Sequence, residues 1–457
     1  MTINVAVIGM GYVGIPIAAL LADTDFFKVT GIQRRSKRSG WKIDYLNQGK
    51  CPIKNEPELP EIIERVVLDK RSFHVTDDVS VLKEMDYVLI DVQTPTDENN
   101  IPQYISLREV CRQTGEVLSK GTTIIIESTC APGTTDYIVK PILEEASGLT
   151  AEKDVYLAFA YERVMVGRLI YNILNYPRIV GGIGPESTEK AVWLYKQVLK
   201  NEIIPTTALT AEIAKVVENT YRDVNVAFAN EVALVCESMG VDVYEVRDLV
   251  NNLPFIKGKR NPHRNMHVPG AGVGGHCLPK DPWLLKYGVT RYGKKPISLD
   301  VIESSRSRNL LMPKHVVDLL KECVIETNRN KPMEQKIAVL GVAFIEDSDD
   351  SRNTPTRDLI KNLSDENYSF SVHDPFVRQN EVEFSFSTNL EEVIRDSDAL
   401  IIVTAHQKYK DLDLGYIKSL MKKKPIIIDG RTTFDPDEAL RHGFSYRGVG
   451  RGHLHSS

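Results

Sequence analysis

Short apolar runs alternate with amphipathic stretches over roughly the first 200 residues of the chain. Runs of this length are typical of buried strands, and the stretches between them have the spacing of helices that pack on one face. Regular alternation of the two predicts a mostly parallel sheet with helices on its faces. The predicted strands are 4–9, 28–33, 87–92, 122–128 and 155–160.

One long helix is predicted next, because residues 207–240 contain no Pro or Gly until their end. A Pro- and Gly-rich loop follows at 261–282. One stripe of the helix has the spacing of a buried face. It comprises Ile213, Val217, Thr220 and Val224.

A second alternating pattern begins near residue 336 and predicts four further strands. The fold class is therefore predicted to be α/β, with two Rossmann-like parallel-sheet domains joined by a central long helix and a helical dimerisation region. We expect an N-terminal domain at 1–205, a central helical domain at 206–325 and a C-terminal domain at 326–457. The four strands are 336–341, 369–373, 399–404 and 425–429.

Composition and charge exclude several classes of function. The net charge of −5 provides no basic field for nucleic acid. No apolar run approaches the ~20 residues that span a bilayer. The six cysteines have neither disulfide-scaffold nor zinc-finger spacing, and the N-terminus lacks the features of a signal peptide. We expect a cytoplasmic protein that binds neither membrane nor nucleic acid.

The sequence GMGYVG at 9–14 follows a predicted strand and opens an apolar helix. In that context the motif predicts a dinucleotide site, because the first two glycines allow pyrophosphate to approach and the third allows close packing of the helix. The helix N-terminus offers amides to phosphate. The residues assigned to the cofactor in this loop are Gly9, Gly11, Tyr12, Val13 and Gly14.

The acid expected about 20 residues past these glycines, which would bind the ribose 2′-hydroxyl, is replaced by Gln33. Arg34 and Arg35 follow it. Gln33 can bond the hydroxyl of NAD beside a solvated basic loop, or the arginines can accept the 2′-phosphate of NADP. NAD is the predicted cofactor and NADP the alternative, with Gln33 and Arg34 assigned to the site.

The segment PGAGVGGHCLPKDP at 269–282 places five glycine or alanine residues just before Cys277. Small residues leave a cysteine accessible, and a nucleophilic cysteine also needs a positive neighbour that lowers its pKa. His276 and Lys280 are near it in sequence. The alternative is a buried structural cysteine. The histidines nearby fit no usual tetrahedral spacing, so no metal is expected.

Six motifs, in order along nearly the whole chain, resemble those of the UDP-glucose/GDP-mannose dehydrogenase family. The cysteine loop with NPHRN at 261–265 most resembles the branch that acts on UDP-N-acetylhexosamines. Ile345 departs from the family, which commonly has a lysine there. The motifs are GMGYVG, STCAPGTT (128–135), AYERVMVG (160–167), a helix pattern (Glu212, Lys215, Asn219, Asn230, Glu231), the cysteine loop, and LGVAFIEDSDDSR (340–352) with HDP (373–375).

The resemblance implies an NAD(P)-dependent four-electron oxidation of the C6 hydroxymethyl of a UDP-N-acetylhexosamine to the uronate. The aldehyde from the first hydride transfer has no second hydride to give until Cys277 adds to it as a thiohemiacetal. The second transfer then gives a thioester, which water hydrolyses. Lys215 and Asp281 are implied to remove the hydroxyl proton, and Asn219 to donate to the oxyanion.

Further roles follow from the same resemblance. Glu162 is implied to activate the hydrolytic water, and Thr129 to order water or the nicotinamide side. Thr94 and Thr129 are assigned to the cofactor. The residues assigned to the substrate are Glu162, Arg163, Lys215, Asn219, Arg264, Gly274 and Arg352.

The active site is expected in the cleft between the two α/β domains, with the C-terminal domain holding the UDP portion. The resemblance also implies a homodimer or larger homo-oligomer through the helical region, and a role in surface polysaccharide biosynthesis. Three alternatives stay open: a UDP-glucose 6-dehydrogenase, a two-electron 3-hydroxyacid-type dehydrogenase without need of Cys277, and a catalytically inactive nucleotide-sugar sensor, which Ile345 slightly supports.

Overall fold

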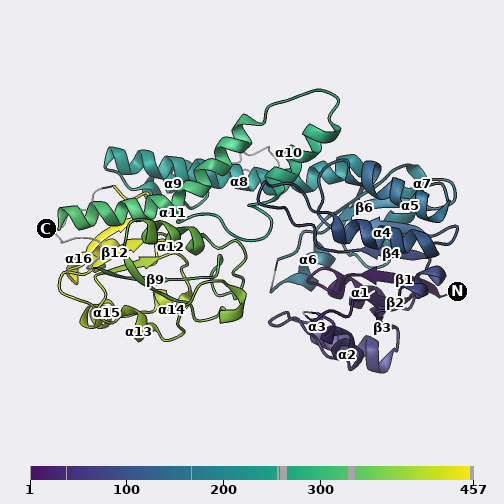
Figure 1. Cartoon of the computed structure of the whole chain (residues 1–457), viewed down its shortest axis with the longest axis horizontal. Helices are drawn as coiled ribbons and strands as arrows, with labels where there is room; N and C mark the ends of the chain where they lie inside the picture. Colours follow the sequence, from purple (N-terminus) through teal and green to yellow (C-terminus); the bar gives the residue numbers. More distant parts are fainter. Residues whose placement is uncertain are drawn as a thin grey trace. The chain divides into compact units, whose positions relative to one another are not determined.

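The chain divides into two compact units (Figure 1). The first comprises Met1–Glu218 and Trp283–Ile297, and the second comprises Asn219–Pro282 and Ser298–Ser457. Each unit contains one sheet of mainly parallel strands, which confirms the predicted α/β class. The three-part boundaries at 205 and 325 stay a prediction. The computed structural model describes residues 2–37, 39–165, 167–254, 257, 265–327 and 335–452.

The sheet of the first unit has the strand order β3-β2-β1-β4-β5-β6-β7-β8. Strands β1 to β6 are parallel, whereas β7 runs antiparallel to β6 and parallel to β8. The chain leaves β1 on one side and returns to β4 on the other, so the loops after β1 and β4 flank a topological switch point. The bounds are β1 Ile3–Ile8, β2 Phe27–Ile32, β3 Phe73–Thr76, β4 Tyr87–Ile90, β5 Thr123–Ile126, β6 Tyr156–Tyr161, β7 Arg178–Gly182 and β8 Ile203–Thr207.

Helices connect these strands, and the five predicted strands of this half are confirmed as β1, β2, β4, β5 and β6. The bounds are α1 Gly14–Asp23, α2 Trp41–Asn47, α3 Leu59–Glu64, η1 Arg65–Asp69, η2 Val79–Glu84, α4 Ile105–Val117, η3 Thr135–Val139, α5 Lys140–Ser147, α6 Leu169–Asn175 and α7 Pro185–Lys196.

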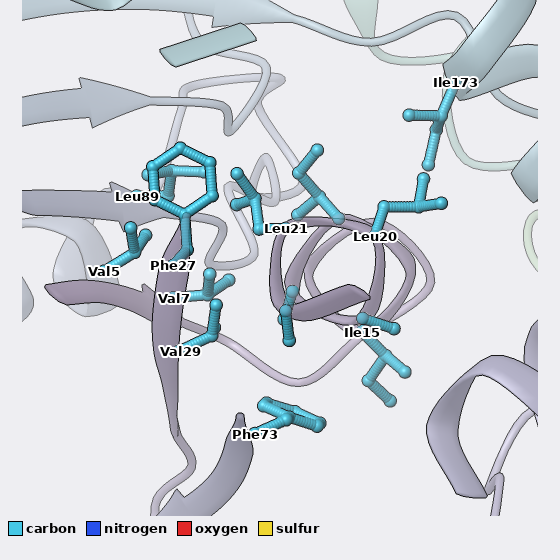
Figure 2. Packing of buried hydrophobic residues seen from close by; sticks show 14 of the residues in the cluster. Val5, Val7, Ile15, Leu20, Leu21, Phe27, Val29, Phe73, Leu89 and Ile173 are labelled. Atoms are coloured by element: carbon cyan, nitrogen blue, oxygen red, sulfur yellow. The ribbon is translucent and has the colours of Figure 1, made fainter. Parts of the chain in front are cut away.

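Helix α1 is the centre of the core of the first unit. Nine of its ten residues are buried, and Figure 2 shows Leu21 on the side of the helix that faces the strand residues Val5, Val7 and Val29. Burial of this apolar surface is the main stabilising term of such a core. The packing fixes the helix N-terminus against the end of β1, where the glycine loop lies.

The sheet of the second unit has the strand order β10-β9-β11-β12-β13, and all its pairs are parallel. Alternate residues of β9 belong to different apolar clusters, so both faces of the sheet are covered. The four predicted strands are confirmed as β9 to β12, and β13 was not predicted. The strand bounds are β9 Lys336–Leu340, β10 Ser369–His373, β11 Ala399–Ile402, β12 Ile426–Asp429 and β13 Ser445–Gly448.

The remaining helices begin with α8, which confirms the predicted long helix at 32 residues. The boundary between the units falls within α8 and again within α10. Their bounds are α8 Ala208–Met239, α9 Val243–Asn251, α10 Asp281–Tyr292, α11 Asp300–Glu326, α12 Pro355–Asp365, η5 Gln379–Glu381, α13 Leu390–Ile394, α14 Gln407–Lys410, α15 Leu414–Leu420 and α16 Pro436–Arg441.

The stripe predicted for α8 is only partly correct. Thr220 is buried, but Ile213 and Val217 are each 40% exposed. The buried face instead includes charged and amide side chains such as Glu212 and Asp223, which have buried partners. Apolar periodicity alone therefore placed the face incorrectly, because this helix buries polar groups that are hydrogen-bonded.

Within the described ranges, no helix has both the length and the apolar character that a membrane crossing requires. The six cysteines all lie within the described residues, and none of them forms a disulfide.

Candidate active site

The glycine loop between β1 and α1 has a backbone shape that excludes side chains at two positions. Gly9 has φ of +109°, and a Cβ there would lie 1.9 Å from the backbone oxygen of Asp91. A Cβ on Gly14 would lie 2.0 Å from the backbone oxygen of Gly9. Gly11 has no heavy atom within 4 Å of where its Cβ would lie. The loop thus offers bare backbone beside the N-terminus of α1, which fits a dinucleotide pyrophosphate.

Gln33 connects the end of β2 to this loop. Its Oε1 accepts a hydrogen bond from the Met10 amide at 3.2 Å, and its Nε2 donates to Ser39 Oγ at 3.0 Å. Lys42 Nζ donates to the Met10 carbonyl at 2.8 Å. Gln33 is therefore in contact with the glycine loop, whereas its contact with the cofactor stays a prediction. Lys42, which was not predicted, brings a positive charge to the loop.

The two arginines after Gln33 differ in their surroundings. Arg35 Nε lies 3.1 Å from a carboxylate oxygen of Asp77, and its Nη1 lies 3.7 Å from Asp44. Arg34 is exposed, and no described residue forms an ion pair with it. Of the two arginines, Arg34 is the one whose guanidinium is not paired with a carboxylate of a described residue.

The loops after β4 and β5 meet across the sheet edge. Thr94 Oγ1 donates a hydrogen bond to the Thr129 carbonyl, and the Val92 amide donates to Ser128 Oγ at 2.8 Å. The structure therefore brings together two of the residues assigned to the cofactor. Tyr12, on the glycine loop, is 47% exposed.

Glu212 anchors the loop that follows β5 to helix α8. Its carboxylate accepts hydrogen bonds from the Gly133 amide at 2.6 Å, and from the Thr135 amide and hydroxyl at 2.8 and 2.7 Å. Burial raises the pKa of Glu212 to about 7, although these donors act in the opposite direction. The sequence motif contained Glu212, but its role in holding this loop was not predicted.

Glu162 and Lys215 form an ion pair in the first unit, in which Lys215 is buried and Glu162 is partly buried. Lys215 Nζ donates to the Glu162 carbonyl at 2.8 Å and lies 3.3 Å from Glu162 Oε1. Glu162 Oε2 accepts from the Val164 amide at 2.6 Å. Lys215 Nζ also lies 5.3 Å from the centre of the Tyr161 ring, within the range of a cation–π contact. The structure thus joins two residues that the sequence assigned to catalysis.

Arg163 is occupied by protein groups. Its guanidinium pairs with Glu218 on α8 and donates to the Pro177 carbonyl at 2.8 Å and to the Tyr161 hydroxyl at 3.2 Å. These contacts tie the segment after β6 to α8. A contact of Arg163 with substrate stays a prediction.

The glycines before Cys277 serve packing in the second unit. A Cβ on Gly274 would lie 2.5 Å from Phe344 Cβ, and a Cβ on Gly275 would lie 2.8 Å from the Phe344 ring. The Asn353 side chain donates to the Gly275 carbonyl at 3.0 Å. The small residues therefore allow the loop to press against Phe344, which is a different reason from the open approach to the half-buried Cys277 that the sequence suggested.

His276 cannot supply a positive charge near neutral pH. Burial, together with the cations Lys280 and Arg352, lowers the pKa of His276 to about 4. Lys280 remains the cationic neighbour in this turn, and its amide donates to the Cys277 carbonyl at 3.0 Å.

Asp281 lies one turn after Cys277 and begins α10. Its side chain is fully buried, and its Oδ2 accepts a hydrogen bond from Asn219 Nδ2 at 2.6 Å. Lys280 Nζ lies 3.1 Å from Asp281 Oδ1 but is not aligned for a hydrogen bond, so Oδ1 has no hydrogen-bond donor among the described residues. The structure brings together Asn219, Asp281 and the turn of Cys277, as the sequence grouped them.

The loops after β9 and β11 flank the switch point of the second sheet. Asp374 accepts hydrogen bonds from the amides of Val342 and Ala343 at 2.6 and 2.9 Å, and His406 Nε2 lies 3.2 Å from it. Ile345, in the same loop, is 52% exposed. Neither Asp374 nor His406 was assigned to the site from the sequence, although Asp374 belongs to the HDP motif.

The assignments of Arg352 and Arg264 to the substrate stay predictions. Arg352 is half exposed, and its Nε donates to Asp350 at 2.8 Å. Arg264 lies outside the described residues. In the part of the chain that the structure describes, no three or more His, Cys, Asp or Glu side chains are grouped to hold a metal ion.

Comparisons with known proteins decide the family. Models of the UDP-glucose/GDP-mannose dehydrogenase family match the chain with the NAD binding domain at 3–199, the central domain at 209–310 and the UDP binding domain at 338–436. The UDP-N-acetyl-D-mannosamine dehydrogenase of Pyrococcus horikoshii is 37% identical over 449 residues, which are 98% of this chain and 99% of that protein. This chain belongs to the UDP-glucose/GDP-mannose dehydrogenase family.

As a member of this family the chain is an NAD-dependent oxidoreductase, which confirms the predicted enzyme class and cofactor. A solved structure described as an NDP-N-acetyl-D-galactosaminuronic acid dehydrogenase from Methanosarcina mazei is 42% identical, with a TM-score of 0.89 over 98% of this chain and 95% of that one. The solved structure of the Pyrococcus horikoshii UDP-D-ManNAc dehydrogenase has a TM-score of 0.87 at 37% identity, over 98% of this chain and 99% of that one. Family membership disfavours the 3-hydroxyacid-type alternative.

Proposed function

We propose that this dehydrogenase oxidises the C6 hydroxymethyl of a UDP-N-acetylhexosamine to the uronate in two NAD-dependent steps. The observation that carries the proposal is the nearly full-length similarity to relatives named for UDP-N-acetylmannosamine and for an N-acetylgalactosaminuronic acid. These names differ in the sugar, so the manno and galacto substrates are the two leading candidates. UDP-glucose is the alternative within the family.

The first oxidation requires removal of the C6 hydroxyl proton. NAD, when bound, accepts a hydride from C6 in each of the two oxidations. We propose that Asp281 and Lys215 together act as the general base that removes this proton, through a water. Asp281 Oδ1 has no hydrogen-bond donor among the described residues, which leaves an acceptor for that water, while Asn219 holds Oδ2. The Lys215 ammonium and the Asn219 amide stabilise negative charge on the C6 oxygen.

The second oxidation requires a nucleophile, because an aldehyde carbon carries no hydride that can leave with an electron pair until a fourth group is added. The Cys277 thiolate adds to the aldehyde, and the resulting thiohemiacetal loses its hydride to give a thioester. Glu162 then takes a proton from water, which attacks the thioester carbonyl and releases the carboxylate and the Cys277 thiol. Thr129 orders the nicotinamide side of the site. In sum, one alcohol, one water and two NAD⁺ give one carboxylate, two NADH and three protons: the C6 carbon is oxidised, and the water supplies the second carboxylate oxygen.

The substrate test measures NADH formed per sugar at completion. UDP-N-acetylmannosamine, UDP-N-acetylgalactosamine, UDP-N-acetylglucosamine and UDP-glucose are each supplied as the limiting reagent with excess NAD. Two NADH per sugar with one N-acetylhexosamine support the proposal and name the sugar. Two NADH with UDP-glucose alone support the alternative substrate. One NADH per sugar, or binding without any turnover, contradicts the four-electron reaction and, in the latter case, supports an inactive sensor.

Cofactor choice at the ribose gives a second prediction. We propose that NAD is the working cofactor and that NADP is used more weakly, through Arg34. Gln33→Glu should lower kcat/KM for NADP by at least about tenfold, because a carboxylate repels the 2′-phosphate, and should change the value for NAD little. Arg34→Ala should lower NADP use alone. Arg35→Ala is the matched control, since Arg35 already pairs with Asp77. An Arg34→Ala enzyme with unchanged NADP kinetics contradicts the proposal.

We also propose that the chain forms a homodimer or larger homo-oligomer through its helical region, and that it works in the cytoplasm. Tyr221, Phe228 and Val235 follow one another at intervals of seven on α8 and are 68%, 59% and 56% exposed. Large apolar side chains exposed in a row are typical of an interface. Phe228→Asp should shift the mass measured by light scattering to that of one chain. Tyr416→Asp, on α15, is the control. A wild-type monomer, or a Phe228→Asp oligomer, contradicts this.

A further inference from the structure

Asp91 follows β4 directly and faces the glycine loop across the switch point of the first sheet. Its Oδ2 lies 3.3 Å from where a Cβ on Gly14 would lie, and its backbone oxygen lies against Gly9. The Gly14 amide, at the start of α1, is directed at the Asp91 carboxyl group. The side chain therefore lies at the helix N-terminus that this fold uses for pyrophosphate.

The charges around Asp91 leave it without a cation of its own. Glu127 and Glu162 follow the next two strands, and each has one: Arg178 pairs with Glu127, and Lys215 lies 3.3 Å from Glu162. No described cationic side chain lies within 4 Å of the Asp91 carboxylate. If Asp91 were ionised, it would be a third carboxylate in a group that has two cations, Arg178 and Lys215.

These surroundings favour the neutral form of Asp91. Burial raises its pKa well above the ordinary value, and the charges of Glu127 and Glu162 raise it further, while the Gly14 amide and Arg178 oppose them. The glycine loop adds one titratable side chain, Tyr12, which is 47% exposed. The carboxylic acid is thus favoured over the carboxylate, so Asp91 keeps its proton to a higher pH than an ordinary aspartate does.

We propose that Asp91 is a cofactor-binding residue that acts as a neutral carboxylic acid. A carboxylate next to the bound pyrophosphate would repel it, whereas the hydroxyl of the acid donates a hydrogen bond to an anionic oxygen. NAD therefore binds the form of the protein that has a proton on Asp91. Where Asp91 is ionised in the free protein, Asp91 takes up a proton from solution when NAD binds. Asp91 lies at the NAD site, so this role does not depend on which sugar is oxidised.

The test measures NAD and NADH binding by titration calorimetry between pH 6 and 9.5. The wild-type Kd should rise by roughly tenfold or more between neutral and alkaline pH, because each unit by which the bound anion raises the pKa of Asp91 changes the affinity tenfold. Buffers of different ionisation enthalpy should show uptake of about one proton per NAD at the alkaline end. Asp91→Asn should bind as wild type at pH 6, with a Kd that changes by less than about threefold over the range and no proton uptake.

Asp25→Asn is the control, because Asp25 is 99% exposed and follows the other end of α1. It should follow the wild type at every pH. If Asp91→Asn does not fold, as judged by thermal unfolding, Asp91→Ser provides the neutral side chain instead. Equal pH dependence in wild type and Asp91→Asn, or a wild-type Kd that does not change with pH, would overturn the proposal. A wild type that binds no NAD at any pH would instead contradict the cofactor assignment.

Discussion

Replacing Cys277 by Ala should abolish formation of the uronate and lower steady-state turnover by about a thousandfold or more. The expected size follows from the chemistry, since without the thiolate there is no tetrahedral adduct from which the second hydride can leave. The first oxidation needs only the proton acceptor and NAD, so it should survive in the variant. Single-turnover experiments should therefore show at most one NADH per sugar, with no covalent sugar on the protein.

The matched control is Cys51→Ala, because Cys51 and Cys277 are the two half-buried cysteines and the other four are buried. It should keep two NADH per sugar and nearly unchanged kcat. The outcome that would contradict the mechanism is a Cys277→Ala enzyme that still makes the uronate at a comparable rate. In that case Cys277 is the structural cysteine that the sequence left as an alternative.

The fold was predictable because its signals are local. A strand buried on both faces shows as a short apolar run, and the glycine loop must have no side chain where Gly9 contacts the Asp91 backbone. β13 was missed because its residues Ser445–Gly448 combine a buried Tyr446 with polar neighbours, so neither apolar continuity nor strict alternation marks it. The buried face of α8 was misplaced for a related reason. It buries the polar residues Glu212 and Asp223, whose partners lie far away in sequence.

The candidate site was predictable only as a set of residues. Through the family pattern, the sequence assigned Lys215 and Asp281 to proton removal, Asn219 to the oxyanion and Glu162 to the water. The structure pairs Asn219 with Asp281 and Lys215 with Glu162, which was not predicted. It could not show that Phe344 is the reason for the glycines before Cys277, because that contact joins positions about 70 residues apart.

The electrostatic surroundings of His276 and Asp91 could not be predicted from the sequence either. His276 appeared as a possible positive neighbour of Cys277, yet burial and two nearby cations keep it neutral near pH 7. Asp91 was not predicted as a site residue, because nothing in the sequence DVQTP shows that its side chain lies against a helix N-terminus and near two other carboxylates. Both depend on which groups the fold brings together, and that information is not local.

Glu162→Gln should separate hydrolysis from oxidation and trap the enzyme as a thioester. The amide keeps the shape of the side chain and can still accept the hydrogen bond from the Val164 amide, but it cannot take a proton from water. Hydrolysis should slow by about 10²–10⁴-fold, the usual contribution of a general base. Rapid mixing with NAD and substrate should give a burst of two NADH per subunit, followed by a slow steady state.

Mass spectrometry of the quenched Glu162→Gln enzyme should find the nucleotide-sugar acyl group on the peptide that contains Cys277, and the double variant with Cys277→Ala should lack it. Glu189→Gln, an exposed change on α7, is the control and should show neither burst nor adduct. Glu162→Gln also removes the carboxylate that pairs with Lys215, so thermal unfolding must show that this variant is folded. Slow turnover without a burst would mean that Glu162 acts before the thioester forms, through its contact with Lys215. A burst of one NADH would place the block at the second hydride transfer. Only two NADH with a trapped acyl group assign Glu162 to the water.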